Sequence, residues 1–429
     1  MKKTEYDIVS FAMVKSTNFD GSSGFKRIFI DRILSWLEIN KYEDDRKLYS
    51  WLFYCLYTAY QDTTCDDGEL QRIESVIGAL MKSVDNNVSA LSRELVDGIF
   101  MLHSLIQSDN LEYLFAQYLL VRDKCLHREN LLRAIGSSID GSLEESNDKF
   151  NRGLAVSIMS LKESGANDMC SGILELCQVQ IEKITRENAI GSHLFVKFVS
   201  EFYSNMDMFS EERSLVLSVI STIQSLQILK PWLFTQYCTE MLLPMTLKIC
   251  YLFLKDDRNN DDIFTNCAKI ISNLLLIHRI KLSYRHHLLN SLLCHYFELV
   301  FESERYNLTG VSAKALSRLI TNLCEPTNVS SATSANDRNS NVLSSKIALV
   351  NKPVRKYLPM VLIKFIKLSI STTLDGTIRK ELTPSIYSIL DLLSQNELNM
   401  ISGMLDNAGK QYFRSFYGEY KRVGKWQDD

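Results

Sequence analysis

Residues that interrupt helices are scarce in this chain. Its 429 residues include only six prolines and seventeen glycines, and both residue types destabilise helix interiors. Apolar residues recur at three- and four-residue steps from Phe25 to Val423, which is the spacing of one face of a helix. The pattern predicts an all-α protein without a β-sheet.

Paired cysteines and apolar leader segments are also lacking. The ten cysteines form no Cys-x-x-Cys pair, and most fall within apolar helical patterns. Secreted disulfide scaffolds are shorter and denser in cysteine, so these side chains are interpreted as reduced, buried thiols. No apolar run of signal-peptide type follows the N-terminus, and the uncharged segment Ser214–Leu229 is too short to span a bilayer. We expect a soluble intracellular protein without membrane contact.

Motifs of catalysis are missing as well. The sequence contains no Gly-x-Ser-x-Gly, no His-Glu-x-x-His and no glycine-rich dinucleotide turn. Gly403 and Gly409-Lys410 suggest a phosphate loop, but five residues separate the glycines where four are needed, and Gln411 replaces the magnesium-binding Ser or Thr. We expect no enzyme, no cofactor and no small-molecule substrate.

One group of histidines and a cysteine has the composition of a metal site, namely His278, His286, His287, Cys294 and His295. Metal sites on helices use ligands three or four residues apart, whereas His287 and Cys294 are separated by about two turns, roughly 10 Å. These residues are therefore interpreted as ordinary helix residues, and no metal site is expected.

Helical patterns follow one another along the chain, separated by short polar turns. Those at 263–279, 284–302 and 311–324 give a period of roughly forty residues for each helical pair. This period is typical of a HEAT- or armadillo-like α-helical solenoid. We expect an N-terminal helical repeat region at 1–189 and a C-terminal helical domain at 190–429.

Residues 326–345 differ in composition from their surroundings. Thirteen of these twenty residues are Ser, Thr, Asn or Asp, and apolar periodicity is missing. Such a segment cannot bury enough apolar surface to offset the entropy of ordering it. We expect a disordered loop inside the C-terminal domain.

Three helix starts can be predicted from capping residues. Ser210 precedes two glutamates and is the expected N-cap of a helix. Thr383 followed by Pro384 predicts another start, with proline at the first helical position. Ser394 and Glu397 have the spacing of a capping box.

Charge is unevenly distributed. The whole chain carries a net charge of −3, but residues 341–425 contain thirteen Lys or Arg and six Asp or Glu. A basic C-terminal quarter on an acidic body indicates an anionic partner at that end.

The most distinctive stretch lies at the end of the chain. Its aromatic residues would gather on one broad face of a helix: Tyr412, Phe413, Phe416, Tyr417 and Tyr420. We expect Phe413, Phe416, Tyr417 and Tyr420, with Trp426 beyond the helix, to be structural. The surrounding basic residues are the candidate binding residues: Lys410, Arg414, Lys421, Arg422 and Lys425.

Three stretches of the C-terminal half carry a family resemblance: Ala315–Pro326, Arg379–Asp391 and Leu405–Trp426. The third is the most specific, with Leu405-Asp406, Gly409-Lys410, Tyr412-Phe413-Arg414, Tyr417, Tyr420-Lys421-Arg422 and Gly424-Lys425-Trp426. Together they resemble the Urb/Npa ("unhealthy ribosome biogenesis") family, in its nucleolar 27S pre-rRNA processing C-terminal domain. Their order and spacing fit that domain over residues 190–429.

The resemblance implies a non-enzymatic α-solenoid scaffold of the nucleus and nucleolus that acts in early large (60S) subunit assembly and rRNA processing. It also implies protein–protein interaction with pre-60S assembly factors, namely a companion Urb/Npa scaffold and a DEAD-box RNA helicase. Two alternatives remain open from the residues. The chain could bind pre-rRNA directly through its basic C-terminal face, or act as a generic intracellular solenoid adaptor.

Overall fold

The computed structural model describes residues 23–39, 147–163, 169–254, 259–282, 285–325 and 354–423, with isolated positions between 52 and 140. Every regular element within these ranges is helical, so the expected all-α class is confirmed for the part of the chain described. The segment 326–345, expected to be disordered, lies outside the described residues. The chain divides into two compact units, Met1–Leu194 and Phe195–Asp429.

In the first unit, the described α-helices are α2 (Ser23–Ile39), α8 (Asn147–Glu163) and α9 (Met169–Lys183), and α10 (Ala189–Ser204) begins there. Helix α8 packs on α9. Glu175 of α9 is buried and accepts hydrogen bonds from Tyr118 Oη at 2.6 Å and from Arg122 Nε at 2.9 Å. Its charge is thus satisfied inside the unit, as a buried carboxylate requires.

The second unit continues α10 and contains these further helices: η3 (Met206–Phe209), α11 (Arg213–Leu229), η4 (Pro231–Leu233), α12 (Gln236–Phe253), α13 (Asp261–Ile277), η5 (Arg279–Leu282), α14 (His286–Phe301), α15 (Ser303–Tyr306), α16 (Gly310–Cys324), α18 (Leu358–Ser371), α19 (Gly376–Leu392), α20 (Gln395–Met404) and α21 (Asn407–Val423). The helices labelled η are short 3₁₀ helices.

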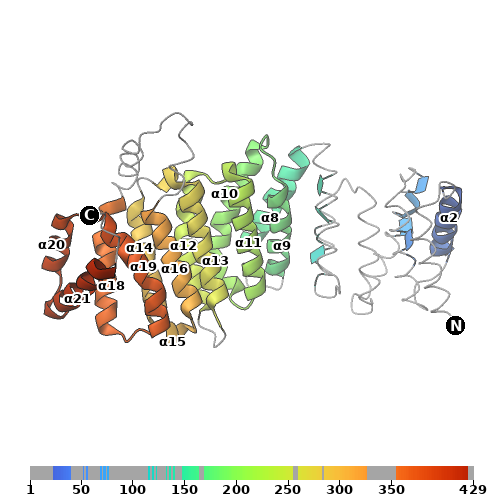
Figure 1. Ribbon diagram of the computed structural model, residues 1–429. Helices are drawn as coiled ribbons and strands as arrows, with labels where there is room; N and C mark the ends of the chain where they lie inside the picture. The colour runs from blue at the N-terminus through green and yellow to red at the C-terminus, as the bar shows by residue number, and fades with distance from the viewer. Residues whose placement is uncertain are drawn as a thin grey trace, which may run out of the picture. The chain divides into compact units, whose positions relative to one another are not determined.

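Two rows of helices make up most of the second unit (Figure 1). In the first row α11, α13, α16 and α19 pack side by side in that order, and in the second row α12, α14, α18 and α21 do the same. The rows pack against each other through α12 with α13, α14 with α16, and α18 with α19. Helix α20 covers α18 and α21. The apolar core lies between the rows.

Buried amides join α11 to α13 in the first row. Gln224 donates to the carbonyl oxygen of Asn266 at 2.9 Å, and Gln227 donates to that of Ile270 at 3.2 Å. Asn273 in turn donates to the side-chain oxygen of Gln227 at 3.1 Å. These directional bonds hold the two helices in one register.

A buried carboxylate joins α13 to α16. Asp261, the first residue of α13, accepts the backbone N–H of Thr309 at 2.9 Å and its hydroxyl at 2.6 Å. The hydroxyl of Ser312 donates to the same carboxylate at 2.6 Å. Thr309 is the N-cap of α16, so Asp261 fixes the position where that helix begins.

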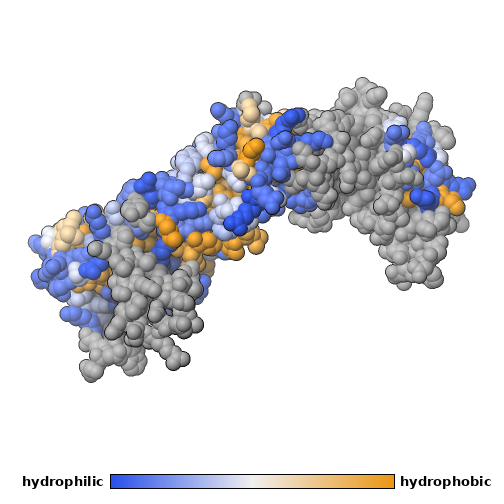
Figure 2. Space-filling view, turned by 90° about the horizontal axis from the view of Figure 1, so that it is seen from above, coloured by the Kyte–Doolittle hydropathy of each residue, from blue (hydrophilic) through white to orange (hydrophobic). Residues whose placement is uncertain are grey.

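The N-terminal ends of α13 and α16 therefore lie together, next to α15 at the lower end of Figure 1. Figure 2 looks from above onto the opposite end, where the C-terminal ends of α11 and α13 lie. Hydrophobic residues gather there in patches on a largely hydrophilic surface. Exposed residues near these ends include Ile228, Leu229, Trp232 and Ile280.

The three predicted helix starts have different outcomes. Ser394 and Glu397 form the expected capping box at α20. The start expected after Ser210 is wrong, because the 3₁₀ helix η3 precedes it and α11 begins at Arg213 without a side-chain cap. The start expected at Thr383-Pro384 is also wrong.

Helix α19 begins at Gly376 and continues through Pro384. A proline inside a helix removes one backbone N–H and leaves the carbonyl four residues earlier without its usual partner. That carbonyl belongs to Lys380, and both residues are exposed, so water can solvate it. Thr383 does not cap a new helix, because its hydroxyl donates back to the carbonyl oxygen of Arg379 at 2.7 Å.

Candidate binding surface of the C-terminal helix

Helix α21 starts with a side-chain cap. Asp406 precedes the helix, and its carboxylate accepts the backbone N–H of Gly409 at 2.8 Å. A Cβ atom at position 409 would lie 2.8 Å from that carboxylate oxygen and 3.1 Å from Leu405. Glycine is therefore the residue that lets the cap close. This geometry accounts for Asp406 and Gly409 appearing together in the C-terminal stretch.

One side of α21 is buried by aromatic contacts. Phe413 and Phe416 are only 6% and 3% exposed. The ring of Phe416 lies 5.8 Å from that of Phe365 on α18 and 5.6 Å from that of Tyr387 on α19. Offset and edge-on pairs at such distances stabilise the structure beyond the area they bury. Phe416 thus joins α21 to both rows.

Tyr420 adds a polar bond to this aromatic contact. Its ring lies 5.3 Å from Tyr387, and its hydroxyl donates to Asp391 near the end of α19. Burial, and then the hydrogen bond to the anionic Asp391, raises the pKa of Tyr420 above its ordinary value. The hydroxyl therefore stays protonated and remains a donor at neutral pH.

A second side of α21 carries the cations. Lys410, Arg414, Tyr417 and Lys421 occur at steps of four, three and four residues, so they share one side of the helix over about 16 Å. We call these four residues the basic stripe. Lys410 and Tyr417 are half-buried, whereas Arg414 and Lys421 are exposed. Lys421 is not a free cation, because its ammonium lies 4.9 Å from the centre of the Tyr417 ring.

The other expected residues of this region lie elsewhere. Arg422 is exposed, and the helical period places it on the opposite side of α21 from Phe413 rather than on the basic stripe. Lys425 and Trp426 lie outside the described residues. The structure thus brings three of the five candidate cations together and separates the fourth from them.

The basic stripe offers hydrogen-bond donors and positive charge. Arg414 presents a planar guanidinium, which suits carboxylate or phosphate oxygens, and Lys421 is oriented by an aromatic ring. The chemistry of the stripe is that of anion recognition.

The residues weighed for other chemistry are spread over separate elements. His278 follows α13, whereas His287, Cys294 and His295 belong to α14, where His295 contacts the carbonyl oxygen of Ser291 in its own helix at 2.8 Å. Within the described ranges no group of three His, Cys, Asp or Glu side chains could hold a metal ion. Gly403 lies in α20 and Gly409 in α21, so no single loop contains both.

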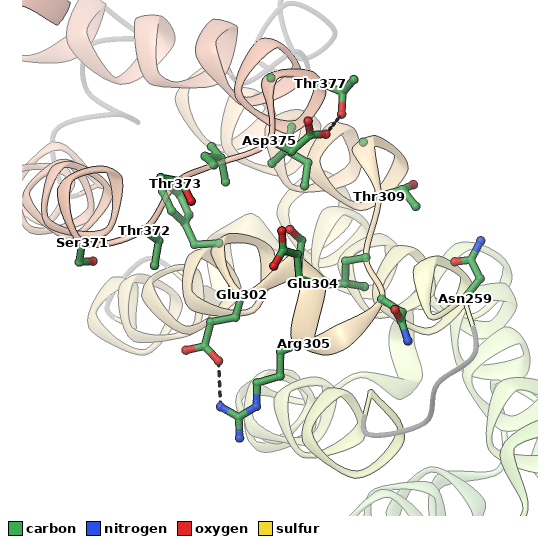
Figure 3. A pocket seen from close by; sticks show the side chains of 18 residues that line it. Asn259, Glu302, Glu304, Arg305, Thr309, Ser371, Thr372, Thr373, Asp375 and Thr377 are labelled. Atoms are coloured by element: carbon green, nitrogen blue, oxygen red, sulfur yellow. Dashed lines mark hydrogen bonds and ion pairs between the residues drawn. The ribbon is translucent and has the colours of Figure 1, made fainter.

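Sequence reasoning missed an open cavity of about 1330 Å³ at the lower end of the rows (Figure 3). Its walls are two connections, 301–310 before and after α15 and 371–378 between α18 and α19. Two of the three carboxylates that line it are engaged, since Glu302 pairs with Arg305 at 2.9 Å and Asp375 accepts the hydroxyl of Thr377. Loop residues have no periodicity, so no sequence pattern could have located this cavity.

The three stretches that carry the family resemblance are bonded to one another. Ser388 of α19 donates to Glu325 at the end of α16 at 3.1 Å. Tyr420 of α21 donates to Asp391 of α19. Each stretch therefore supplies one partner of a polar contact between helices, which ties α16, α19 and α21 into one structure.

The fold and the site thus define an all-helical protein in which two packed rows of helices include the basic, aromatic helix α21. A model of the Urb2/Npa2 family matches residues 217–429, and through this half the chain belongs to that family. Membership implies a role in ribosome biogenesis. None of the curated proteins compared with the chain matches it. No helix in the described ranges has the length and apolarity needed to cross a membrane.

Proposed function

We propose that the chain is a non-enzymatic scaffold in early large (60S) ribosomal subunit biogenesis and pre-rRNA processing, acting in the nucleolus. The observation that carries this proposal is the Urb2/Npa2 family match over residues 217–429. A scaffold needs extended surfaces rather than one reactive centre. The row arrangement supports this, because every helix within a row leaves one side directed away from the core.

The proposed architecture is a HEAT- or armadillo-like solenoid. Solenoids are built from helix pairs that contact only their neighbours, and the side-by-side contacts within each row of the second unit agree with this. Bonds between equivalent helices support the same reading. Arg213 donates to Asn260, 47 residues away, and Arg285 donates to Glu240, 45 residues away, so the spacing between pairs is regular.

The proposed partners are pre-60S assembly factors, among them a companion Urb/Npa scaffold and a DEAD-box RNA helicase. We place the family-specific contacts in the C-terminal domain at 190–429 and leave the N-terminal repeat region at 1–189 for other contacts. The basic stripe is the proposed binding site within the C-terminal domain. Its most exposed cations, Arg414 and Lys421, would pair with an acidic segment of a partner protein.

Direct binding of pre-rRNA by the basic stripe is the second candidate. Tyr417 favours it, because this half-exposed ring lies between Arg414 and Lys421 on one side of α21. RNA-binding proteins commonly combine cations for phosphates with an aromatic ring on which a base can stack. The two candidates differ in whether contact depends on RNA.

Affinity purification of the tagged full chain from cell extract, with and without RNase, tests both. We expect pre-60S factors to co-purify, and Arg414→Glu with Lys421→Glu to weaken that association at an almost unchanged melting temperature. The matched control reverses Lys356 and Lys367, two exposed lysines at and near α18, and should have no effect. Equal losses in both double variants would rule out a specific role of the stripe. Loss of pre-60S factors after RNase treatment would favour the second candidate.

A further inference from the structure

The outward sides of the four helices in the first row carry mainly hydroxyl and basic side chains. In α11 this side presents four exposed serines, at 214, 218, 221 and 225. In α13 and α16 it presents residues at steps of three, four and three, namely Asp262, Thr265, Lys269 and Ser272 on α13 and Val311, Lys314, Arg318 and Thr321 on α16, and in α19 it presents Thr377, Lys380 and Pro384. Such steps keep residues on one side of a helix.

These four sides form one surface. The helices are consecutive neighbours in the first row (Figure 1), and α13, α16 and α19 pack on the second row through α12, α14 and α18. The N-terminal ends of α13 and α16 are joined by Asp261 and Thr309. Lys269 follows Asp261 by eight residues, and Lys314 follows Thr309 by five. Neighbouring helix axes are separated by about 8–10 Å. We call the outward sides of α11, α13, α16 and α19 the hydroxyl–lysine face.

Four cations of this face have no ion-pair partner among the described residues, namely Lys269, Lys314, Arg318 and Lys380. Four carboxylates lie along or next to the same sides. Asp262 pairs with Arg213 on the neighbouring helix. Glu325 accepts from Ser388, and Asp391 accepts from Tyr420. The half-buried Glu381 lies next to Gly310 and forms no ion pair within the described ranges. The positions that define the face carry four cations and one carboxylate, Asp262, which is paired with Arg213, so their net charge is positive.

Several cations elsewhere in this unit are paired with carboxylates. Arg285 pairs with Glu240 and Lys248 with Asp207, each at 2.7 Å. Arg355 reaches Glu397 at 2.7 Å. The cations of the hydroxyl–lysine face differ from these because they stand among serines and threonines, which cannot neutralise them.

We infer that the hydroxyl–lysine face binds the phosphate backbone of RNA. Lysine, arginine and hydroxyl side chains are the usual donors to phosphate oxygens, and small serines allow a backbone to approach closely. The positions that define the face include no exposed aromatic ring on which a base could stack. The nearby Tyr387 ring is packed against Phe416 and Tyr420. Binding should therefore be independent of base sequence. The inference rests on the proposed function in that pre-ribosomal particles supply the RNA.

Salt dependence tests this inference on the full chain. Binding to a mixed-sequence RNA hairpin is measured by fluorescence anisotropy at KCl concentrations between about 50 and 200 mM, a range in which phosphate contacts lose affinity steeply. The variant K269Q/K314Q/R318Q/K380Q should bind at least about tenfold more weakly at the low-salt end. Its slope of log affinity against log salt should be smaller by about 3–4, since each neutralised phosphate contributes about 0.7–0.9.

Matched double variants locate the effect. K314Q/R318Q on α16 should lower the slope by about 1.5–2, whereas K356Q/K367Q, which removes the same charge at α18, should leave it within error. A second hairpin of different sequence should bind equally well. Circular dichroism melting of each variant excludes loss of fold as the cause.

Three results would overturn the inference: an unchanged slope for the quadruple variant, equal losses in the two double variants, or displacement by polyglutamate as efficient as by RNA. The last result would assign the face to an acidic protein. Failure here is separable from failure of the proposed function. A chain that co-purifies with pre-60S factors but binds hairpin RNA as well after the four substitutions would keep the scaffold role and lose this face.

Discussion

Two parts of the second unit are held together by different kinds of contact. Helices α11, α13 and α16 are joined by buried amides and by the carboxylate of Asp261. Helices α18, α19 and α21 are joined chiefly by rings, with Phe416 in contact with both Phe365 and Tyr387. Polar bonds fix direction and register, whereas rings supply apolar area and tolerate small shifts. The first part should therefore depend on individual hydrogen bonds and the second on side-chain volume.

Removing the central ring should have the largest effect. Phe416→Ala should destabilise the C-terminal end by about 3–5 kcal/mol, because a buried aromatic side chain is lost and a cavity remains. Denaturant unfolding combined with hydrogen exchange on α18, α19 and α21 measures this. Gln411→Ala, at an exposed position of the same helix, is the control and should cost much less. Equal effects of the two substitutions would mean that α21 does not depend on the Phe416 contact.

Removing the hydrogen bonds that Asp261 of α13 accepts from the start of α16 should have a smaller but more localised effect. Burial by itself raises the pKa of Asp261, but hydrogen bonds from Ser312 and Thr309 outweigh it and hold the pKa below its ordinary value. Asp261→Asn should cost about 1.5–3 kcal/mol, the range for hydrogen bonds to a charged group. Hydrogen exchange should increase first at the start of α16.

The neighbouring Asp262→Asn is the matched control for this variant. Asp262 is exposed and forms an ion pair with the half-buried Arg213, which also donates to Asn260, so its loss should cost less than that of the buried Asp261. If Asp262→Asn destabilises α16 as much as Asp261→Asn does, negative charge at the start of α13, rather than the hydrogen bonds of Asp261, stabilises the contact between α13 and α16.

The same comparison explains what could be predicted from the sequence. Rings at three- and four-residue steps mark a buried helix side, and the capping box at Ser394 lies within four residues. These signals are local. Gln224 and Asn266 are 42 residues apart and Asp261 and Ser312 are 51 apart, so no local pattern connects them. These hydrogen bonds depend on which helices lie side by side, and that arrangement is set by the tertiary fold.

Two further differences between the sequence-based predictions and the structure have local physical causes. Thr383-Pro384 has the composition of a helix start, but exposure lets α19 continue through the proline. The candidate cations were expected to surround the aromatic side as a group. The helical period instead places Lys410, Arg414 and Lys421 on one side and Arg422 on another. What these cations bind stays a prediction.

Substitution of a buried histidine should have the smallest effect on stability at neutral pH. The effect should grow as the pH falls. His278 follows α13, is only 4% exposed, and its ring lies 5.4 Å from that of Phe234. Burial, and then the nearby Lys281 ammonium, lowers the pKa of His278 to about 4. The ordinary value in an unfolded chain is about 6.5.

The unfolded chain therefore binds a proton at position 278 that the folded chain rejects between these two pH values. Stability from this group is fully present above about pH 6.5 and is lost as the pH falls toward 4. His278→Phe removes the titrating group, so the free energy of unfolding of the variant relative to the unmodified chain should rise steadily from pH 6.5 to pH 4.5. Urea unfolding at four pH values measures this difference. His287→Phe, at an exposed position of α14, should leave it constant. A constant difference for His278→Phe would mean that the imidazole can accept its proton without losing its contact with Phe234.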